Sequence, residues 1–352
     1  MTPKLNFQRR LALLKNGLKV NALDSILITN ETNVAYLSGF PGHDSMILIT
    51  LEKNFFITDS RYIEEAEKTL DGFYVKLVEI STYDTVSEII KKHRLKKIGF
   101  EAMDLPYGVA VRLYKLIKGA KLVPCKEMVE SIRSVKDSGE IALIRESVSL
   151  NKKVFNLTAG RVKPGVSEKA LAVMVEAAFI NEGARSAFRP IIASGENASK
   201  PHAIPERVKI KNNSFVMIDI GVKLNGYCSD ITRMITLGRV KNKFKKIYNI
   251  VKAAQDRAIE TIRPGVRIRD VDAAGRDHIK DEGFGKCFGH SLGHGVGLSV
   301  HEKPTISSIS EGLIAPGMVF TVEPAIYIPK FGGVRIEDMV LVTDKGCEVL
   351  TR

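Results

Sequence analysis

Short apolar runs alternate with amphipathic stretches through the first third of the chain. The runs are rich in Ile, Leu, Val and Phe and predict strands at residues 25–29, 46–50, 54–58, 75–78 and 97–100. The stretches between them have helical spacing and predict helices at residues 5–18, 61–70, 82–92 and 106–117. Asp59-Ser60 is the expected cap of the second helix. Strands that alternate with helices are typical of an α/β domain.

The pattern changes near residue 130. A polar stretch at residues 131–140 precedes a long helical pattern that runs to about Thr158, with Ser138 as its expected N-cap. A chain of 352 residues suits two domains. We therefore predict an α/β domain over residues 1–130 and a second domain over residues 131–352.

The second domain contains an internal repeat. Lys163-Pro164-Gly165-Val166 recurs as Arg263-Pro264-Gly265-Val266, and Glu182-Gly183 recurs as Glu282-Gly283. A helical pattern follows the turn in each copy. The repeat continues where an apolar run ending in Asp219 matches one ending in Glu323. Several matches in one order predict two related halves around a pseudo-twofold axis.

Two predicted hairpins place carboxylates inside apolar strands. In the first, Asn225-Gly226 is a strong turn signal, and a four-residue turn over 223–226 would set Asp219 directly opposite Asp230. In the second, a turn near residues 329–333 brings Glu323 towards Glu337. Facing carboxylates in an apolar setting need a positive partner, and a metal ion is the simplest one.

Four of the seven histidines lie in two segments rich in Gly and Pro. His290, His294 and His301 share G-H-S-L-G-H-G-V-G-L-S-V-H-E, and His202 lies in S-G-E-N-A-S-K-P-H-A-I-P. A neutral imidazole can complete a carboxylate metal site or donate to developing negative charge. The spacing of Cys287 and His290 is a weak zinc signal. Neither of the usual glycine-rich nucleotide motifs is present, which argues against nucleotide binding.

Composition and charge narrow the class of protein. Lys and Arg number 53 against 40 Asp and Glu, a net charge of +13. This charge raises nucleic acid as a partner, but it is spread along the chain and lacks interleaved aromatic residues, so no nucleic acid is expected. The four cysteines form no C-x-x-C pair and the N-terminus has no apolar signal segment, so we expect a cytoplasmic protein. The apolar runs are far too short to span a membrane.

The motifs together resemble one family. The ordered set D-I-G, S-D-I-T-R, G-H-x-x-G-H, V-E-P and R-I-E-D over residues 133–352 closely resembles the pita-bread metallopeptidases. The N-terminal α/β domain, with L-S-G-F and T-D-S-R-Y, and the segment P-H-A-I-P resemble the prolidase and aminopeptidase P branch. The resemblance implies a creatinase/prolidase-like N-terminal domain, serving dimerisation or substrate access, and an α+β pita-bread catalytic domain with a pseudo-twofold repeat. Ala325, where the family more often has glycine, is the one departure.

The resemblance also implies the roles of individual residues. The expected metal ligands are Asp219, Asp230, His294, Glu323 and Glu337. His202 and His301 are expected to contact the substrate and the tetrahedral intermediate, His290 to lie near the proline-side pocket, and Arg335 to orient carboxylates and bind substrate. Glu323, His301 and His202 are the expected catalytic residues. Asp59, Arg61 and Tyr62 are weaker candidates for reaching a partner's pocket.

Oxygen ligands with one imidazole suit two divalent ions, with Mn²⁺ or Co²⁺ preferred over Zn²⁺ or Fe²⁺. A water shared by two such ions is a hydroxide nucleophile near neutral pH. The expected reaction is hydrolysis of an Xaa-Pro bond in a peptide with proline after its first residue. The bond has no N–H, so peptidases that need that donor cannot use it.

Two questions about the reaction stay open at this point. Nothing in the sequence separates a dipeptidase from an aminopeptidase. A metal-dependent amidase of the same fold and a non-catalytic pita-bread binding module are the alternatives, and the full set of five ligand candidates argues against the second. The family implies a homodimer.

Overall fold

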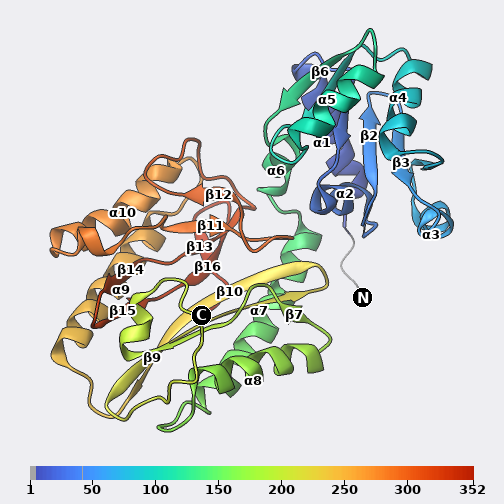
Figure 1. Cartoon of the computed structure of the whole chain (residues 1–352). Coiled ribbons are helices and arrows are strands. Elements are labelled where there is room, and N and C mark those ends of the chain that lie inside the picture. Colours follow the sequence, from blue (N-terminus) through green and yellow to red (C-terminus); the bar gives the residue numbers. More distant parts are fainter. Residues whose placement is uncertain (1–4, 42) are drawn as a thin grey trace. The chain divides into compact units, whose positions relative to one another are not determined.

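The structure, a computed structural model, describes residues 5–41 and 43–352. It contains two compact units (Figure 1): residues 6–133 form one, and residues 134–352 together with Leu5 form the other. Among the described residues, no helix is both long enough and apolar enough to cross a membrane. We call the two units the N-terminal unit and, after the role that the resemblance implies for it, the catalytic unit.

The N-terminal unit is a six-stranded mixed sheet with helices. Its elements are α1 (Phe7–Val20), β1 (Ser25–Ile28), α2 (Glu31–Ser38), β2 (Met46–Thr50), β3 (Asn54–Thr58), α3 (Ile63–Thr69), β4 (Tyr74–Leu77), α4 (Thr82–Lys92), β5 (Lys97–Glu101), α5 (Tyr107–Leu116), β6 (Lys121–Cys125) and α6 (Met128–Arg133). The strand order is β4-β3-β2-β1-β5-β6, with β1, β5 and β6 parallel to one another.

The core of this sheet follows from the apolar runs. Side chains of β1, β2, β3 and β5 pack against α4 and α5 in one buried cluster, in which Ile57, Ile90 and Leu113 are at most 2% exposed. The α/β class predicted from the sequence is confirmed. One prediction is wrong in detail: α3 begins after Tyr62 without a side-chain cap, because the Asp59 carboxylate accepts the backbone N–H of Arg61 in a turn that precedes the helix.

The catalytic unit begins with the long helix predicted at the domain junction. Its elements are α7 (Ser138–Ala159), α8 (Glu168–Asn181), β7 (Arg185–Ser186), β8 (Ile191–Ser194), η1 (Gly195–Ser199), β9 (Ser214–Leu224), β10 (Tyr227–Leu237), α9 (Asn242–Thr261), α10 (Ile268–Asp281), η2 (Gly285–Cys287), β11 (Gly293–Gly295), β12 (Glu302–Ile306), β13 (Val319–Val322), β14 (Ala325–Ile328), β15 (Gly332–Arg335), β16 (Asp338–Val342) and β17 (Cys347–Val349).

The N-cap of α7 differs from the expectation. Asp137, not Ser138, caps the helix: its carboxylate accepts the backbone N–H of Glu140, and the Glu140 side chain accepts the backbone N–H of Asp137 in return. This reciprocal capping box satisfies two backbone donors that a helix start otherwise leaves open. Ser138 is then the first helical residue.

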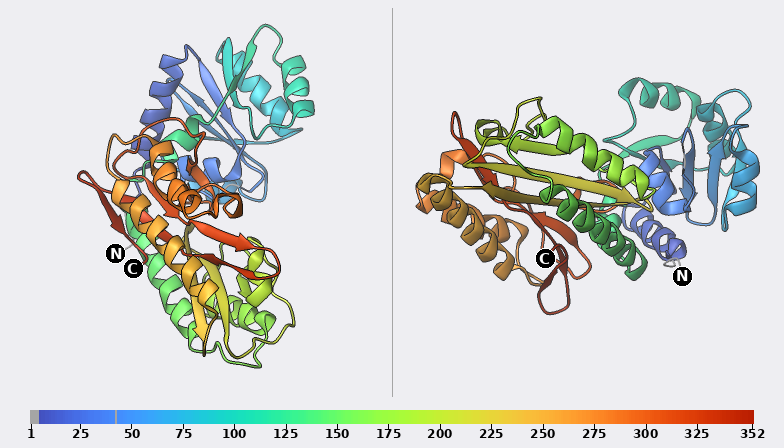
Figure 2. Two further views of the ribbon diagram at one scale, coloured as in Figure 1. Left: turned by 90° about the vertical axis from the view of Figure 1, so that its left-hand side faces the viewer. Right: turned by 90° about the horizontal axis from the view of Figure 1, so that it is seen from below.

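The repeat in the sequence corresponds to two similar halves. In the first, α7 and α8 pack on β8, β9 and β10, where Val154, Val175 and Ile218 are buried. In the second, α9 and α10 pack on β13 and β16, where Val251, Ile279 and Phe320 are buried. The long hairpin of β9 and β10 runs beside α7 in both views of Figure 2. The predicted α+β fold with a pseudo-twofold repeat is confirmed.

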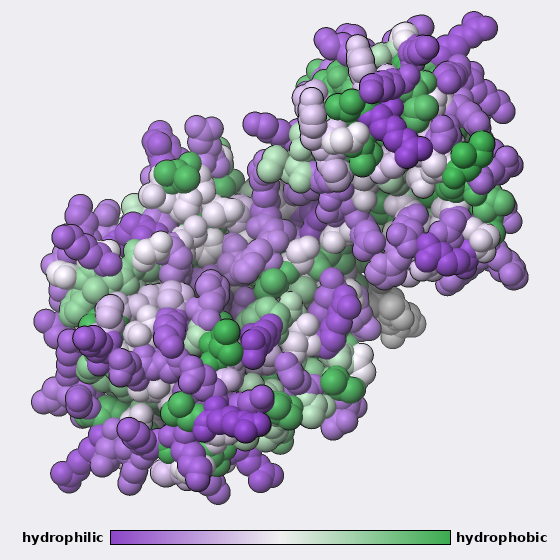
Figure 3. All heavy atoms as spheres, in the orientation of Figure 1, coloured by the Kyte–Doolittle hydropathy of each residue, from purple (hydrophilic) through white to green (hydrophobic). Residues whose placement is uncertain are grey.

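The surface of the protein carries both hydrophilic and apolar side chains. The face in Figure 3 is hydrophilic over most of its area, with apolar side chains in several separate groups. Scattered exposed apolar residues are ordinary for a folded chain.

Candidate metal centre

The first pair of carboxylates lies on the hairpin of β9 and β10. Asn225 and Gly226 both have positive φ angles, 49° and 85°, and make a two-residue turn that pairs Leu224 with Tyr227. The predicted four-residue turn is therefore wrong by two residues in register: Asp219 pairs with Thr232, and Asp230 pairs with Gly221. Because Asp230 lies two residues before Thr232, both aspartates still point to the same face of the hairpin.

The second pair lies between two neighbouring ladders. Val322 of β13 pairs with Asp338 of β16, and Ala325 of β14 pairs with Arg335 of β15. Glu323 and Glu337 are the residues next to these pairs, so the two glutamates face each other as the second hairpin predicted. An isolated bridge between Thr232 and Glu337 joins this region to β10.

His294 on β11 completes the cluster. Its Nε2 lies 3.2 Å from Glu323 Oε1 and 3.8 Å from Asp230 Oδ2. One ligand atom each of Asp230, His294 and Glu337 lies within 4.8 Å of the others. The Nδ1 of His294 lies 3.2 Å from the Gly295 carbonyl oxygen, which only accepts, so Nδ1 carries a proton and Nε2 faces the carboxylates.

Glycines on both sides of His294 allow this placement. A Cβ at Gly293 would lie 1.9 Å from the Thr321 carbonyl oxygen, and one at Gly295 would lie 2.1 Å from the Lys303 carbonyl oxygen. No other residue fits so close to the neighbouring strands. The glycines in the G-H-G sequence thus hold His294 against its neighbours rather than forming a phosphate loop.

Arg335 links the two halves behind the carboxylates. Its buried guanidinium contacts the Asp219 carboxylate and the Tyr327 hydroxyl, and its Nη1 donates to the Pro201 carbonyl oxygen at 3.1 Å. Its Nε lies 3.2 Å from Thr232 Oγ1, and that hydroxyl donates to Glu337 Oε2 at 2.7 Å. These contacts orient a carboxylate from each half, which supports the orienting part of the role expected for Arg335.

The protonation of the cluster follows from burial and from its neighbours. Burial, with the nearby carboxylates, raises the pKa of Asp230 and of Glu337 well above the usual range, and burial also raises that of Asp219. Burial opposes ionisation of Glu323 too, but the hydrogen bond and charge of His294 lower its pKa to about 2. The same contact raises the pKa of His294 against the effect of burial. The cluster therefore favours added positive charge.

The donor set fits divalent metal ions. Among the described residues, the buried atoms Asp219 Oδ1 and Asp230 Oδ1 have no hydrogen-bond partner. A buried carboxylate oxygen without a partner is costly, and a cation satisfies it. Four carboxylates and one imidazole are ligands that suit Mn²⁺, Co²⁺, Fe²⁺ or Zn²⁺.

The other predicted histidines lie around the cluster. The His301 ring meets the His294 ring edge to face, with centroids 4.1 Å apart. His290 Nδ1 lies 2.8 Å from the Ser291 carbonyl oxygen and its Nε2 lies 3.3 Å from the Tyr327 hydroxyl. Burial lowers the pKa of His290 and of His301. His202 is exposed and follows Pro201, which contacts Arg335.

The weaker candidates belong to the N-terminal unit. Arg61 pairs there with Asp59 and with Asp44, both within that unit. The backbone N–H of Arg61 also donates to Asp59, so these residues have a local structural role.

Sequence reasoning missed the residues that support the ligands. Thr232 and Tyr327 contact Arg335, and Thr321 accepts the backbone N–H of His294 at 3.0 Å and donates to Glu323 Oε1 at 3.1 Å. Thr232 could have been found, since it lies two residues after Asp230 on the same strand face. Thr321 carries a similar signal, because it lies two residues before Glu323, whereas nothing local marks Tyr327.

Fold and site together define a metallopeptidase of the pita-bread type. The sequence model of metallopeptidase family M24 matches residues 142–344, and that of the creatinase/prolidase N-terminal domain matches residues 10–135. The chain therefore belongs to metallopeptidase family M24, within the group that contains the Xaa-Pro dipeptidases.

Individual relatives cover nearly the whole chain. An uncharacterized peptidase of Bacillus subtilis is 39% identical over 343 residues, 97% of each chain. The Xaa-Pro dipeptidase of Pyrococcus horikoshii is 36% identical over 94% of this chain and 93% of its own. Among solved structures, the Xaa-Pro dipeptidase from Bacillus anthracis matches with a TM-score of 0.95 and 38% identity over 99% of this chain and 98% of its own. The X-Pro aminopeptidase from Thermotoga maritima matches with a TM-score of 0.87 and 33% identity over 96% and 97%.

Proposed function

We propose that this metallopeptidase hydrolyses Xaa-Pro peptide bonds with two divalent metal ions held by Asp219, Asp230, His294, Glu323 and Glu337. The observation that carries the proposal is the convergence of these five side chains, with two bare buried carboxylate oxygens among them. The relatives named Xaa-Pro dipeptidase and X-Pro aminopeptidase support the choice of bond.

The metal ions supply a water of lowered pKa and polarise the scissile carbonyl when they are bound. The chain's own residues supply the rest. Glu323, whose Oε1 lies 3.2 Å from His294 Nε2, would accept a proton from the attacking water and pass it to the leaving nitrogen. Thr321 fixes the rotamer of Glu323 through a 3.1 Å hydrogen bond.

Three histidines surround this chemistry. Burial lowers the pKa of His301, so its ring is neutral and donates an N–H to the negative charge that develops on the carbonyl oxygen. His202, exposed on its loop, donates a second hydrogen bond. Both nitrogens of His290 already have protein partners, so it would meet a proline ring with its ring face. Arg335 acts from behind by holding Asp219, and Mn²⁺ or Co²⁺ is the proposed metal.

The test is direct. The purified chain is stripped of metal, reloaded with Mn²⁺ or Co²⁺, and incubated with Ala-Pro, with Ala-Pro-Ala-Ala and, as the control, with Met-Ala-Ser. Proline released only from the dipeptide identifies a dipeptidase, and alanine released from the tetrapeptide identifies an aminopeptidase. Cleavage of Met-Ala-Ser alone, or of none of the three, contradicts the proposal. The cytoplasmic location and the homodimer stay predictions from the sequence.

A further inference from the structure

Glu168, the first residue of α8, is a buried carboxylate outside the metal cluster. Its side chain accepts four hydrogen bonds, and it is 0% exposed. Oε1 accepts from the backbone N–H of Ser194 at 2.6 Å and from its hydroxyl at 2.7 Å. Oε2 accepts from Asn197 Nδ2 at 2.8 Å and from the backbone N–H of Glu206 at 3.2 Å. The carboxylate also lies at a helix N-terminus, which stabilises its charge.

The four donors belong to three residues at the two ends of one loop. Ser194 is the last residue of β8, Asn197 lies in η1 near the start of the loop, and Glu206 is the last residue of the loop. We call residues 195–206 the His202 loop. Glu168 therefore joins the two ends of the segment that carries His202.

The opposite side of the His202 loop faces the metal cluster. Pro201, next to His202, accepts a hydrogen bond from Arg335, which also contacts Asp219. The backbone of η1 lies against β15 so closely that a Cβ at Gly333 would be 2.3 Å from the Ala198 carbonyl oxygen. The loop is thus held between Glu168 on one side and β15 with Arg335 on the other.

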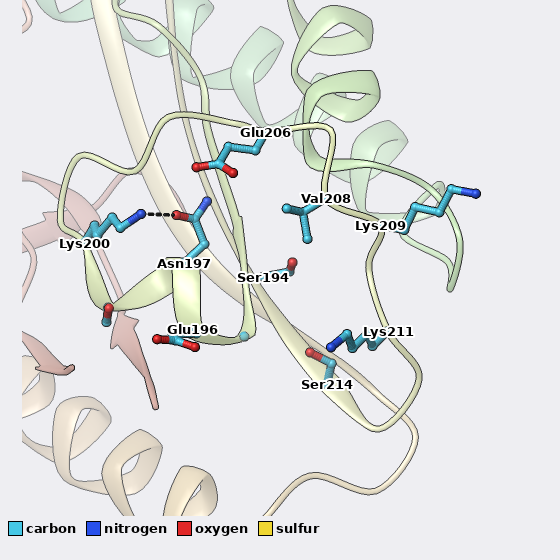
Figure 4. A pocket seen from close by; sticks show the side chains of 11 residues that line it. Ser194, Glu196, Asn197, Lys200, Glu206, Val208, Lys209, Lys211 and Ser214 are labelled. Carbon is cyan, nitrogen blue, oxygen red and sulfur yellow. Dashed lines mark hydrogen bonds between the residues drawn. The ribbon is translucent and has the colours of Figure 1, made fainter. Parts of the chain in front are cut away.

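Packing alone does not hold the side near Glu168. A pocket of about 370 Å³ opens there, and Ser194, Asn197 and Glu206, the three residues that contact Glu168, are among those that line it. Figure 4 shows these side chains around the open space, with Lys200 bonded to Asn197 at its edge. On this side, hydrogen bonds to Glu168 hold the loop in place, whereas apolar packing holds other segments of the unit.

The second half of the repeat shows that the fold itself needs no acid here. Residue 268 corresponds to residue 168 through the matched turns at Gly165 and Gly265, and it is Ile268, 5% exposed. Helix α10 therefore begins with an apolar side chain where α8 begins with Glu168. The acid is present in the half whose loop carries His202.

We propose that Glu168 is a positioning residue that fixes the conformation of the His202 loop and so sets His202 against the metal centre. This inference rests on the proposed function for the role of His202. Glu168 touches neither substrate nor metal, and its effect reaches the reaction only through His202.

The main test variant is Glu168→Gln, which keeps the shape but replaces one acceptor oxygen by an NH₂ donor facing two donors. We expect kcat/KM for the cleaved Xaa-Pro peptide to fall about tenfold, mostly in kcat, because a displacement of about 1 Å can cost up to 10²-fold. In a His202→Ala background the same change should alter kcat/KM less than twofold. The matched control is Glu182→Gln, the same substitution at the other end of α8, where the side chain pairs with Lys153 on the surface.

A second readout needs no activity. In the metal-free chain, amide hydrogen exchange of residues 195–206 should be at least about tenfold faster in Glu168→Gln than in Glu182→Gln. Should Glu168→Gln fail to fold, Asn197→Ala removes one donor from the loop side and should give a smaller change of the same kind. Unchanged exchange, or a full effect of Glu168→Gln in the His202→Ala background, overturns the inference. A wild-type chain that cleaves no Xaa-Pro peptide contradicts the proposed function, while the exchange experiment still decides whether Glu168 fixes the loop.

Discussion

The two halves of the catalytic unit share a backbone plan down to single hydrogen bonds. The N–H of Gly165 donates to the Ile210 carbonyl at 2.9 Å, and the N–H of Gly265 donates to the Ile314 carbonyl at 2.9 Å. Both glycines have positive φ angles, 89° and 85°, which favour glycine. The turn, the helix after it and the returning segment are therefore what the fold requires in each half.

The halves differ in the polar residues that hold their histidine segments. In the first half Glu168 binds the ends of the His202 loop. In the second, the buried Asp272 pairs with the partly exposed Arg276 on α10. Arg276 donates to the carbonyl oxygens of Phe288 and His290, and Asp272 accepts the N–H of Leu292. The comparison teaches that the repeat provides the frame, and that different acids in each half fix the functional segments.

Substitutions of the proposed metal ligands give the largest expected effect, and these residues come from both halves. Asp230→Asn in the first half and Glu337→Gln in the second should each lower kcat/KM by at least about 10³-fold, since metal charge stabilisation is worth several kcal/mol. The metal-free form of each variant should unfold at a higher temperature than the metal-free wild type, because a carboxylate with a raised pKa has been replaced by a neutral group. Steady-state kinetics, metal content and thermal unfolding measure this. An effect from one half only would show that the halves do not share the site.

The clamp in the second half comes next. Asp272→Ala removes a buried acceptor from Arg276 and from the backbone N–H of Leu292, and because Arg276 stays partly exposed we expect a loss of about 2 kcal/mol of unfolding free energy. Urea denaturation measures it. The matched control is Lys252→Ala, which breaks a pair of the same spacing with Asp256 on α9, where both side chains are 40% exposed. We expect less than about 0.5 kcal/mol there. Equal losses would mean that Asp272 and Arg276 do not act as a clamp.

Local patterns predicted much of the N-terminal unit. The strands at 46–50 and 54–58 and the helix at 82–92 have the predicted bounds, because their apolar periods are clear and turn residues flank them. Helix α2, strand β6 and helix α6 were not predicted. The first has only eight residues, and short elements depend on tertiary packing rather than on their own pattern.

The candidate site also contains parts that the sequence predicts and parts that it does not. The repeat and the turn signals correctly predicted that the carboxylates lie close together. The predicted register of β9 and β10 was wrong by two residues, because Asn225 and Gly226 alone make the turn. The supporting contacts were out of reach. Thr232 and Glu337 are 105 residues apart along the chain, and Ser194 and Glu168 are 26 apart, so only the folded structure joins them.

Metal loading tests whether the two halves are held together by cations. Burial raises the pKa of Asp230 and Glu337, so the folded metal-free chain binds protons that the unfolded chain has released. The contribution of these two carboxyl groups to the stability of the metal-free fold is therefore greatest below about pH 4. It is lost as the pH rises through their raised pKa values in the folded chain. Added Mn²⁺ at about 100 times its Kd should stabilise the fold by about 2.7 kcal/mol per site at pH 8, and by less at pH 5, where protons compete. Thermal unfolding at both pH values, with and without Mn²⁺, measures this. A metal effect that grows on acidification would contradict the assignment of these carboxylates.

The smallest expected effect concerns the helices that open the two halves. Helix α7 begins at the capping box of Asp137 and Glu140, whereas α9 begins after Lys241, which has no side-chain cap. Asp137→Ala should cost about 1 kcal/mol of unfolding free energy, because the N–H of Glu140 loses its acceptor. Lys241→Ala should be close to neutral, and Lys241→Asp should stabilise by several tenths of a kcal/mol, because it supplies the missing acceptor and a negative charge at a helix start. Urea denaturation of the metal-loaded chain measures all three. If Asp137→Ala and Lys241→Ala had the same effect, the capping box would contribute nothing, and the two halves would begin alike in energy although they differ in sequence.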